Sequence, residues 1–198
     1  MAKNDTENDH ADAFWDFSVE VYGREGVEAA CLALQDRHGI DVNMLLFCCW
    51  AGASGYGTLD EDDFSRALAV SRPWQQEIVA PLRQVRARLK AALPTAPKKT
   101  AEAVRQRVAA AEIDAERVEQ LMIAAMLTRS PGAEQASASG LPDAIVNLER
   151  YLSVAADLEE FGDAADHADL VALLAGTFPT LSRDEIEPRL AATLCGDC

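Results

Sequence analysis

Apolar residues recur along this chain with the spacing of one helical face. In the segment from Asp12 to Tyr22, Phe14, Phe17 and Val21 stand three and four residues apart, which places them on a single stripe of a helix. No stretch shows the strict alternation of apolar and polar residues that marks a half-buried strand. The pattern therefore predicts an all-α fold, an orthogonal or bundle-like packing of several helices.

Turn and capping residues divide this pattern into a series of expected helices. Gly39 follows one helix where left-handed backbone is favoured, and Asp41 is placed to cap the next. Thr58, with Glu61 three residues later, has the spacing of a capping box. The expected helices span residues 12–22, 27–38, 42–52, 58–71, 73–93, 100–128, 142–160, 163–176 and 182–194.

Two prolines fall within the expected helix 73–93. Pro73 suits the first turn of a helix, where no intrahelical N–H bond is lost. Pro81 lies inside the helix and cannot donate to the carbonyl one turn earlier. We therefore expect one helix to end near Ser71 and a new one to begin at Pro73, with a kink or break at Pro81.

Composition predicts four parts in the chain. Residues 1–11 are polar and acidic and are expected to form a disordered tail, followed by a helical core domain over 12–129. The run SPGAEQASASG, residues 130–140, is expected to be a flexible linker. Residues 141–198 are then expected to form a C-terminal helical extension.

Targeting signals are absent from the sequence pattern. The amino-terminal segment lacks the basic and apolar regions of a signal peptide. No apolar run approaches the roughly 20 residues that a membrane-spanning helix needs. The cysteines are odd in number and widely spread, which favours a reducing compartment. We therefore expect a cytoplasmic protein without a membrane partner.

The run MLLFCCW, in the expected helix 42–52, is apolar on every side, which predicts a helix that is buried all round. Adjacent Cys48 and Cys49 point about 100° apart on a helix and do not comfortably share one metal ion. Core packing is therefore the favoured interpretation of this run. A thiol or zinc site stays open as a further hypothesis, with the candidate thiols Cys31, Cys48, Cys49, Cys195 and Cys198, of which the last two form a terminal CGDC.

Charge is unevenly distributed along the chain. The net charge of −15 argues against general nucleic-acid binding, because phosphate contacts need a basic surface. Residues 72–107 nevertheless carry nine Lys and Arg against two acids. These cations can pair with acidic helices of the same chain, which is the favoured interpretation, or form a face for an anionic protein partner. The candidate partner face comprises Arg83, Arg86, Arg88 and Lys90.

Polar residues gather at the junction between the expected helices 27–38 and 42–52. Asp36 lies in the last turn of its helix, where the dipole disfavours a carboxylate, so it is expected to take a partner from a neighbouring helix. The candidate ligand pocket comprises Trp15, Asp16, Gln35, Asp36, Asn43 and Arg83. On the first helix, Asp12, Asp16 and Glu20 share a face that would bind Mg²⁺ only opposite a second acidic helix. A solvated face is the favoured interpretation there.

The run from Phe14 to Gly52 contains Phe-Trp, Leu-Gln-Asp and Asp-Val-Asn elements. Together with Trp74, Pro81-Leu82-Arg83 and EIDAERVEQ at 112–120, it resembles a family of uncharacterised bacterial helical proteins, a domain of unknown function. The resemblance covers residues 14–128 and implies a bacterial cytoplasmic protein, but it implies no reaction, cofactor or catalytic residue. The positions that match its motifs are Trp15, Gln35, Asp36, Asp41, Asn43, Trp74 and Arg83.

No catalytic constellation is recognisable in the sequence, since the glycines at 52, 55 and 57 fit neither a nucleophile elbow nor a dinucleotide fingerprint. The favoured hypothesis is a non-enzymatic helical protein that acts through protein–protein contacts, as an adaptor or regulator. The alternative is a small-ligand or metal-binding helical protein, or an enzyme, with a polar pocket around Asp36 and Arg83. The cofactor and the oligomeric state are left open.

Overall fold

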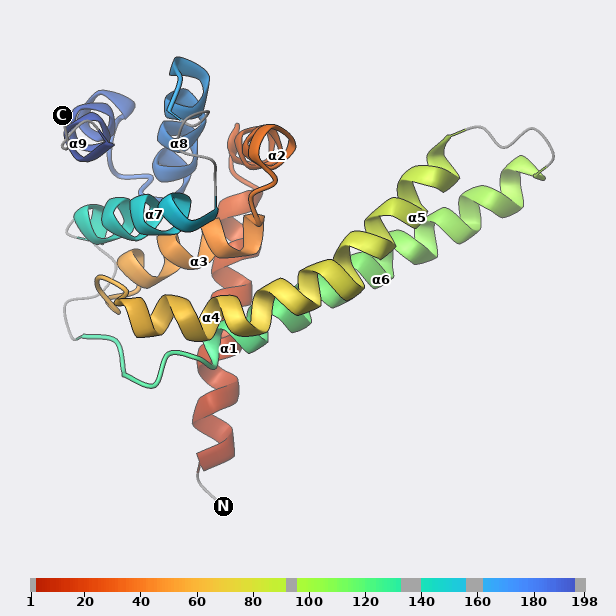
Figure 1. The fold of residues 1–198 in the computed structure, drawn as a ribbon, viewed down its shortest axis with the longest axis horizontal. Coiled ribbons are helices and arrows are strands. Elements are labelled where there is room, and N and C mark those ends of the chain that lie inside the picture. Colours follow the sequence, from red (N-terminus) through yellow and green to blue (C-terminus); the bar gives the residue numbers. More distant parts are fainter. Residues whose placement is uncertain (1–2, 92–95, 133–139, 156–161, 195–198) are drawn as a thin grey trace.

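The computed structural model describes residues 3–91, 96–132, 140–155 and 162–194. Within these ranges it is helical and contains no strand, which confirms the all-α prediction (Figure 1). The elements are α1 (Lys3–Tyr22), α2 (Val27–His38), α3 (Val42–Ala53), α4 (Glu61–Trp74), η1 (Gln75–Val79), α5 (Ala80–Lys90), α6 (Lys98–Ala124), α7 (Leu141–Ala155), α8 (Ala164–Thr177) and α9 (Arg183–Leu194).

Helix α3 is the centre of the hydrophobic core, as its apolar sequence predicts. Eleven of its twelve residues are buried, from Asn43 to Ala53. Asp41 caps the helix by accepting a hydrogen bond from the backbone N–H of Asn43, and Gly39 ends α2 with a φ of 66°. The two expected caps at this junction are therefore confirmed.

Helices α7, α8 and α9 share the same core as α1–α3. At the crossing of α3 and α7, a Cβ atom added to Gly52 would lie 2.6 Å from the backbone nitrogen of Ala144. Glycine is therefore needed for this close approach. Apolar residues of all three C-terminal helices, such as Leu148, Leu173 and Ile186, belong to the core cluster. The expected C-terminal extension thus packs onto the core domain through its own buried side chains.

Helix α2 is also tied to α8 by charged groups. The guanidinium of Arg37 donates to Asp166 Oδ1 at 2.9 Å and to Asp169 Oδ2 at 2.6 Å. His38 Nε2 lies 2.8 Å from Asp166 Oδ1. Burial opposes ionisation of Asp166, but hydrogen bonds from the Gly162 N–H, His38 and Arg37 outweigh it and hold the pKa of this carboxyl below its usual range.

The expected break before Pro73 is wrong, because α4 continues through η1 into α5. Residues at both joins keep right-handed helical backbone, and Pro73 lies inside the last turn of α4. η1 is π-helical, with the Ala80 N–H donating to the Gln75 carbonyl five residues earlier. This wider turn immediately precedes Pro81 and tolerates its missing N–H within a continuous helix.

Two further helix starts differ from their expected positions. The capping box of α4 is formed by Asp60 and Asp63, while the Thr58 hydroxyl donates to Asp143 Oδ1 at 2.7 Å. Carboxylates two residues further on therefore take the capping role expected of Thr58. Helix α1 begins at Lys3, inside the segment expected as a disordered tail, so the backbone of this segment is helical from that residue.

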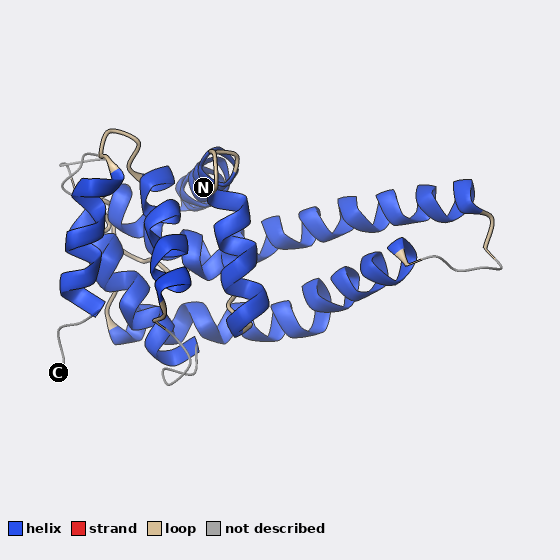
Figure 2. Cartoon of the chain, turned by 90° about the horizontal axis from the view of Figure 1, so that it is seen from above, coloured by secondary structure: helices blue, strands red, loops and turns tan. Residues whose placement is uncertain are grey.

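The paired helices α5 and α6 extend away from the rest of the molecule, as both views show (Figures 1 and 2). We call α5 and the amino-terminal half of α6 the arm. Helix α5 has no buried residue, in contrast to α3. Among the described helices, none has the length and apolar content that crossing a membrane requires.

Candidate functional site

We call the described helices outside the arm the body. A cavity of about 650 Å³ lies where the arm joins the body. Its wall draws on five neighbouring parts of the fold: α1, α2, the start of α3, the η1–α5 segment and α6. The lining residues include Trp15, Ser18, Val19, Tyr22, Glu28, Leu32, Gln35, Asp36, Asp41, Asn43, Gln75, Arg83, Arg86, Arg105, Ala109, Glu112, Ile113, Glu116 and Gln120.

Five of the six residues of the predicted ligand pocket line this cavity: Trp15, Gln35, Asp36, Asn43 and Arg83. Asp16 is exposed and is not among the lining residues. Asp36 is also exposed, at the mouth of the cavity, and in the described part of the chain it has no hydrogen bond or ion pair, so the partner expected for it is not found there. Solvent contact relieves its unfavourable position at the end of α2. That these residues bind a ligand stays a prediction.

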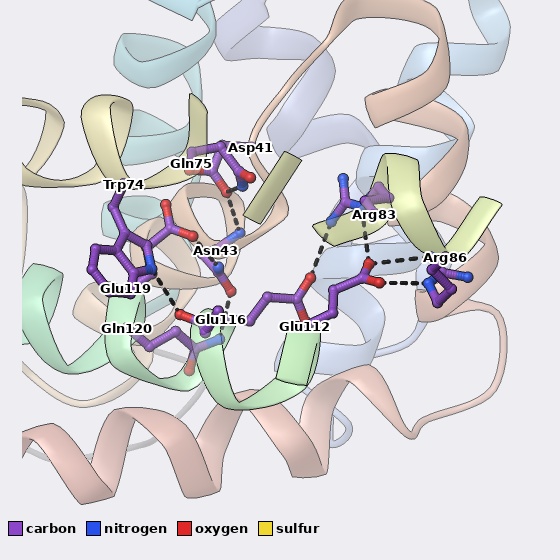
Figure 3. A network of polar contacts seen from close by, with 11 residues as sticks. Asp41, Asn43, Trp74, Gln75, Arg83, Arg86, Glu112, Glu116, Glu119 and Gln120 are labelled. Atoms are coloured by element: carbon purple, nitrogen blue, oxygen red, sulfur yellow. Dashed lines mark hydrogen bonds and ion pairs between the residues drawn. The ribbon is translucent and has the colours of Figure 1, made fainter. Parts of the chain in front are cut away.

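The floor of the cavity is a polar network around Asp41. Its Oδ1 atom accepts hydrogen bonds from the backbone N–H of Asn43 at 2.9 Å and from Gln75 Nε2 at 3.3 Å (Figure 3). Its Oδ2 atom lies 2.7 Å from the Ser71 hydroxyl. The Asp41 N–H donates to the hydroxyl of Tyr151 on α7 at 3.0 Å, which connects the floor to the core.

Glu119 lies beneath this floor with no exposed surface. Its Oε2 atom accepts from Asn43 Nδ2 at 2.8 Å, and Asn43 Oδ1 in turn accepts from Gln120 Nε2 at 2.8 Å (Figure 3). Its Oε1 atom lies 2.9 Å from the hydroxyl of Ser71, which also contacts Asp41. The network therefore joins α3, α4, η1 and α6 through the carboxyls of Glu119 and Asp41.

Glu119 is held in its protonated form in the cavity floor. The Ser71 hydroxyl contacts both carboxyls but has only one proton to donate, so the second contact requires a proton on a carboxyl. Burial, then the negative charge of Asp41 and its hydrogen bond, raise the pKa of Glu119 to about 9. Glu119 is therefore neutral at neutral pH.

The side wall of the cavity consists of ion pairs between α5 and α6. Arg83 donates to Glu112 Oε1 at 3.2 Å and to Glu116 Oε1 at 3.0 Å (Figure 3). Arg86 forms two hydrogen bonds with the carboxylate of Glu112. Burial opposes ionisation of Glu112, but these guanidinium hydrogen bonds outweigh it and keep its pKa below its usual range.

These ion pairs narrow the predicted partner face. Arg83 and Arg86 are held by acidic residues of the same chain, as the intramolecular interpretation of the basic segment expects. Arg88 and Lys90 are exposed, and within the described residues no ion pair engages them. That any of the four candidates contacts a partner stays a prediction.

Three buried polar atoms of the cavity wall have no hydrogen-bond partner: Ser18 Oγ, Gln75 Oε1 and Gln120 Oε1. Ser18 and Gln120 are each only 3% exposed. The orientation of the Gln75 amide follows from chemistry, since its nitrogen must face the Asp41 carboxylate and its oxygen must point elsewhere. The cavity thus offers hydrogen-bond acceptors that the chain itself leaves unused.

The acidic face of α1 lies apart from this network. Asp12 pairs with Arg117 at 3.1 Å, and Glu20 pairs with Arg24. The Arg117 guanidinium also lies 5.6 Å from the centroid of the Trp15 ring. Throughout the described residues, no group of three His, Cys, Asp or Glu side chains is arranged to hold a metal ion.

The cysteines of the body are core residues. Cys31, Cys48 and Cys49 are free and fully buried. Burial raises the pKa of Cys31 and of Cys49 to about 12 and raises that of Cys48 well above its usual range. Thiols that do not ionise are unreactive. Cys195 and Cys198 lie outside the described residues.

Sequence reasoning missed the acidic side of the site on α6. Glu112, Glu116, Glu119 and Gln120 follow one another at i, i+4, i+7 and i+8, which is the spacing of a single helical face. In the sequence, the run EIDAERVEQ at 112–120 indicates only the resemblance to the family. A search for polar residues at this spacing, in addition to apolar ones, would have identified the face.

The family model of a protein of unknown function, DUF2390, matches residues 13–123, more than half of the chain. The chain belongs to the DUF2390 family. Every residue that lines the cavity lies inside the DUF2390 region, whereas α7–α9 lie beyond it. No curated protein and no solved structure matches the chain. The predicted resemblance to a family of helical proteins of unknown function is thereby confirmed over residues 13–123.

Proposed function

We propose that this protein binds a small polar ligand in the cavity between α1–α3 and the α5–α6 pair. The observation that carries the proposal is the set of buried, unpartnered atoms Ser18 Oγ, Gln75 Oε1 and Gln120 Oε1 in the cavity wall. A buried polar atom without a partner costs about 1–3 kcal/mol, and a ligand that hydrogen-bonds to it recovers part of this free energy. The volume of about 650 Å³ is in the range of small-molecule sites.

Two neighbouring alanines of α6 provide a matched test. Ala109 lines the cavity, whereas Ala110 is exposed. Ala109→Phe places a ring inside the cavity, and Ala110→Phe adds the same ring outside it. Native mass spectrometry and ligand-observed NMR with a library of small polar molecules should detect ligands bound to the wild type and to A110F but not to A109F. Circular dichroism checks that all three fold. A library in which no member distinguishes the wild type from A109F would refute the proposal.

A second candidate function is protein–protein contact through the arm, as an adaptor or regulator would use. The observation that favours it is the position of exposed Val85 and Arg88 three residues apart on α5, in a helix pair that extends from the body (Figure 1). Charge reversal of Arg88 and Lys90 should then abolish capture of a partner in a pull-down while leaving the melting temperature unchanged. A partner retained by this double variant would exclude these residues as the contact.

Both candidates fit a bacterial cytoplasmic location. Free thiols persist in a reducing compartment, and Cys31, Cys48 and Cys49 are free. Fractionation of a bacterium that carries the gene would test this location: the protein should appear in the cytoplasmic fraction, and its appearance in the periplasm would contradict the proposal.

A further inference from the structure

We infer that the ligand of the cavity is an organic cation, an ammonium or amidinium group attached to an apolar alkyl or aryl part. This inference rests on the proposed function and names the chemical class of the ligand. It follows from which donors, acceptors and apolar surfaces of the cavity the chain already uses.

The cationic side chains of the cavity wall are all engaged. Arg83 and Arg86 pair with the carboxylates of Glu112 and Glu116. Arg105 forms two hydrogen bonds, of 2.7 and 2.6 Å, with both carboxylate oxygens of Glu102. A ligand anion would therefore have to compete for these guanidinium groups with carboxylates that are already in place. Its desolvation next to those carboxylates would also be unfavourable.

The anionic side chains, in contrast, are partly unmatched. Glu28, Asp36 and Asp41 line the cavity, and within the described residues none of them forms an ion pair with Lys, Arg or His. Burial is the main cause that raises the pKa of Tyr22 to about 12; Cys31 and then the carboxylates of Glu28 and Glu116 raise it further, and Arg83 opposes them. The field in the cavity therefore favours a cation.

The unpartnered atoms have the same preference. Gln75 Oε1 and Gln120 Oε1 are carbonyl oxygens, which accept hydrogen bonds and cannot donate them, and the Ser18 hydroxyl accepts as well as donates. An ammonium group has three donors and an amidinium group has more, so either group supplies what these atoms lack. Ser18 and Gln120 are each 3% exposed, so these atoms lie in the buried part of the cavity wall.

The mouth of the cavity also carries exposed apolar side chains. Val19, Leu32 and Ile113 line it and are 55%, 41% and 53% exposed, which is unusual for large apolar side chains. An alkyl or aryl group on the ligand would cover them while its cationic end reaches the acceptors. A bare metal ion fits less well, since in the described residues no three His, Cys, Asp or Glu side chains converge.

The test compares isosteric probes that differ in one polar group: phenethylamine, 2-phenylethanol and phenylacetate, with hexylamine, hexanol and hexanoate as an alkyl series. Titration calorimetry with the full chain at pH 7 should show the amines binding at least about tenfold more tightly than the alcohols, because hydrogen bonds to a charged donor are stronger than neutral ones. The carboxylates should bind more weakly than the alcohols.

Matched charge variants assign the effect to the cavity. Glu28→Gln with Asp36→Asn removes two carboxylates of the cavity and should weaken amine binding about fivefold while leaving alcohol binding unchanged. Asp62→Asn with Glu187→Gln removes the same charge from exposed positions that do not line the cavity, and should leave both unchanged. An equal loss in both double variants would show that the amines respond only to net charge and would overturn the inference.

The outcomes separate this inference from the proposed function. If an alcohol or a carboxylate binds the wild type as tightly as its matched amine, and A109F abolishes that binding, the inference fails and the cavity remains a ligand site. If no probe of either series binds the wild type better than it binds A109F, the inference fails; the proposed function fails with it only if the library of small polar molecules also contains no member that distinguishes the two proteins.

Discussion

Helices α3 and α5 represent two ways in which this chain holds itself together. Helix α3 buries eleven of its twelve residues, whereas α5, with eleven residues, buries none. The first is fixed by apolar contacts and a backbone crossing at Gly52, and the second by guanidinium–carboxylate pairs to α6. The cavity lies where these two regions meet, so its floor is a hydrogen-bonded network around the buried Glu119 while its wall consists of charged side chains near solvent.

The largest effect is expected from Gly52→Ala in the body. The new Cβ atom would lie 2.6 to 2.8 Å from backbone and Cβ atoms of Ala144 and from the Gly140 carbonyl oxygen, and two packed backbones cannot easily move apart. We expect the free energy of unfolding to fall by about 3 kcal/mol, measured by urea denaturation.

Gly132→Ala is the control for this substitution. A Cβ atom at Gly132 would meet its nearest neighbour, the Gly55 carbonyl oxygen, at an ordinary 3.5 Å. The expected change is within about 0.5 kcal/mol. Equal effects of the two substitutions would mean that the α3–α7 crossing is not the rigid contact on which the comparison depends.

The next effect concerns the proton on the Glu119 carboxyl in the cavity floor. The pKa of Glu119 is raised from 4.5 to about 9, so between these values the folded chain holds a proton that the unfolded chain has lost. The stabilisation is complete below about pH 4.5 and is lost as the pH rises toward 9. The side chain at position 119 of Glu119→Gln cannot titrate. The unfolding free energy of the wild type relative to that of E119Q should therefore fall by about 2 kcal/mol from pH 6 to pH 8.

Urea denaturation of both proteins at pH 6, 7 and 8 measures this difference, in which the titration of other groups cancels. Asp62→Asn, at an exposed position of α4, serves as the control and should run parallel to the wild type. Parallel curves for E119Q as well would show that Glu119 is ionised in the folded chain, and the floor would then carry two charges.

The same contrast explains what the sequence predicts well. The all-α class, the buried helix 42–53 and the caps at Gly39 and Asp41 follow from local periodicity and turn chemistry, which a single sequence contains. The pocket residues Gln35, Asp36 and Asn43 were found because a polar cluster between two apolar helices is unusual. In each case the informative residues are neighbours along the chain.

The sequence could not place residues whose roles depend on distant partners. Glu119 and Ser71 are ordinary polar positions until α4 and α6 bring them to within 2.9 Å of one another. The break expected before Pro73 fails for a related reason. Contacts with distant residues hold the continuous α4–η1–α5 helix against α6, such as the hydrogen bond from Trp74 Nε1 to the Ala115 carbonyl at 2.9 Å. Local propensity was overridden by contacts that only the fold supplies.

A smaller effect is expected from the ion pair that joins α5 to α6. Arg86→Ala leaves Glu112, which is 6% exposed, with Arg83 as its remaining guanidinium partner. We expect a loss of about 1 kcal/mol at pH 7. Because the pKa of Glu112 is held below its usual range, this stabilisation is present above that range and is lost as the pH falls, so R86A and wild type should converge once the pH is below the lowered pKa of Glu112. Loss of the same size at every pH would instead indicate lost packing of the arginine stem.

The smallest effect is expected from Arg88→Ala with Lys90→Ala, further along the same helix. Both side chains are exposed, and the described residues offer them no ion pair, so the free energy of unfolding should change by less than about 0.5 kcal/mol. Comparison with R86A at low and high salt sharpens the result, since only a specific pair should lose its contribution on screening. A double variant as costly as R86A would mean that the whole arm is held by its positive charge, which would leave no cation on α5 available to a partner.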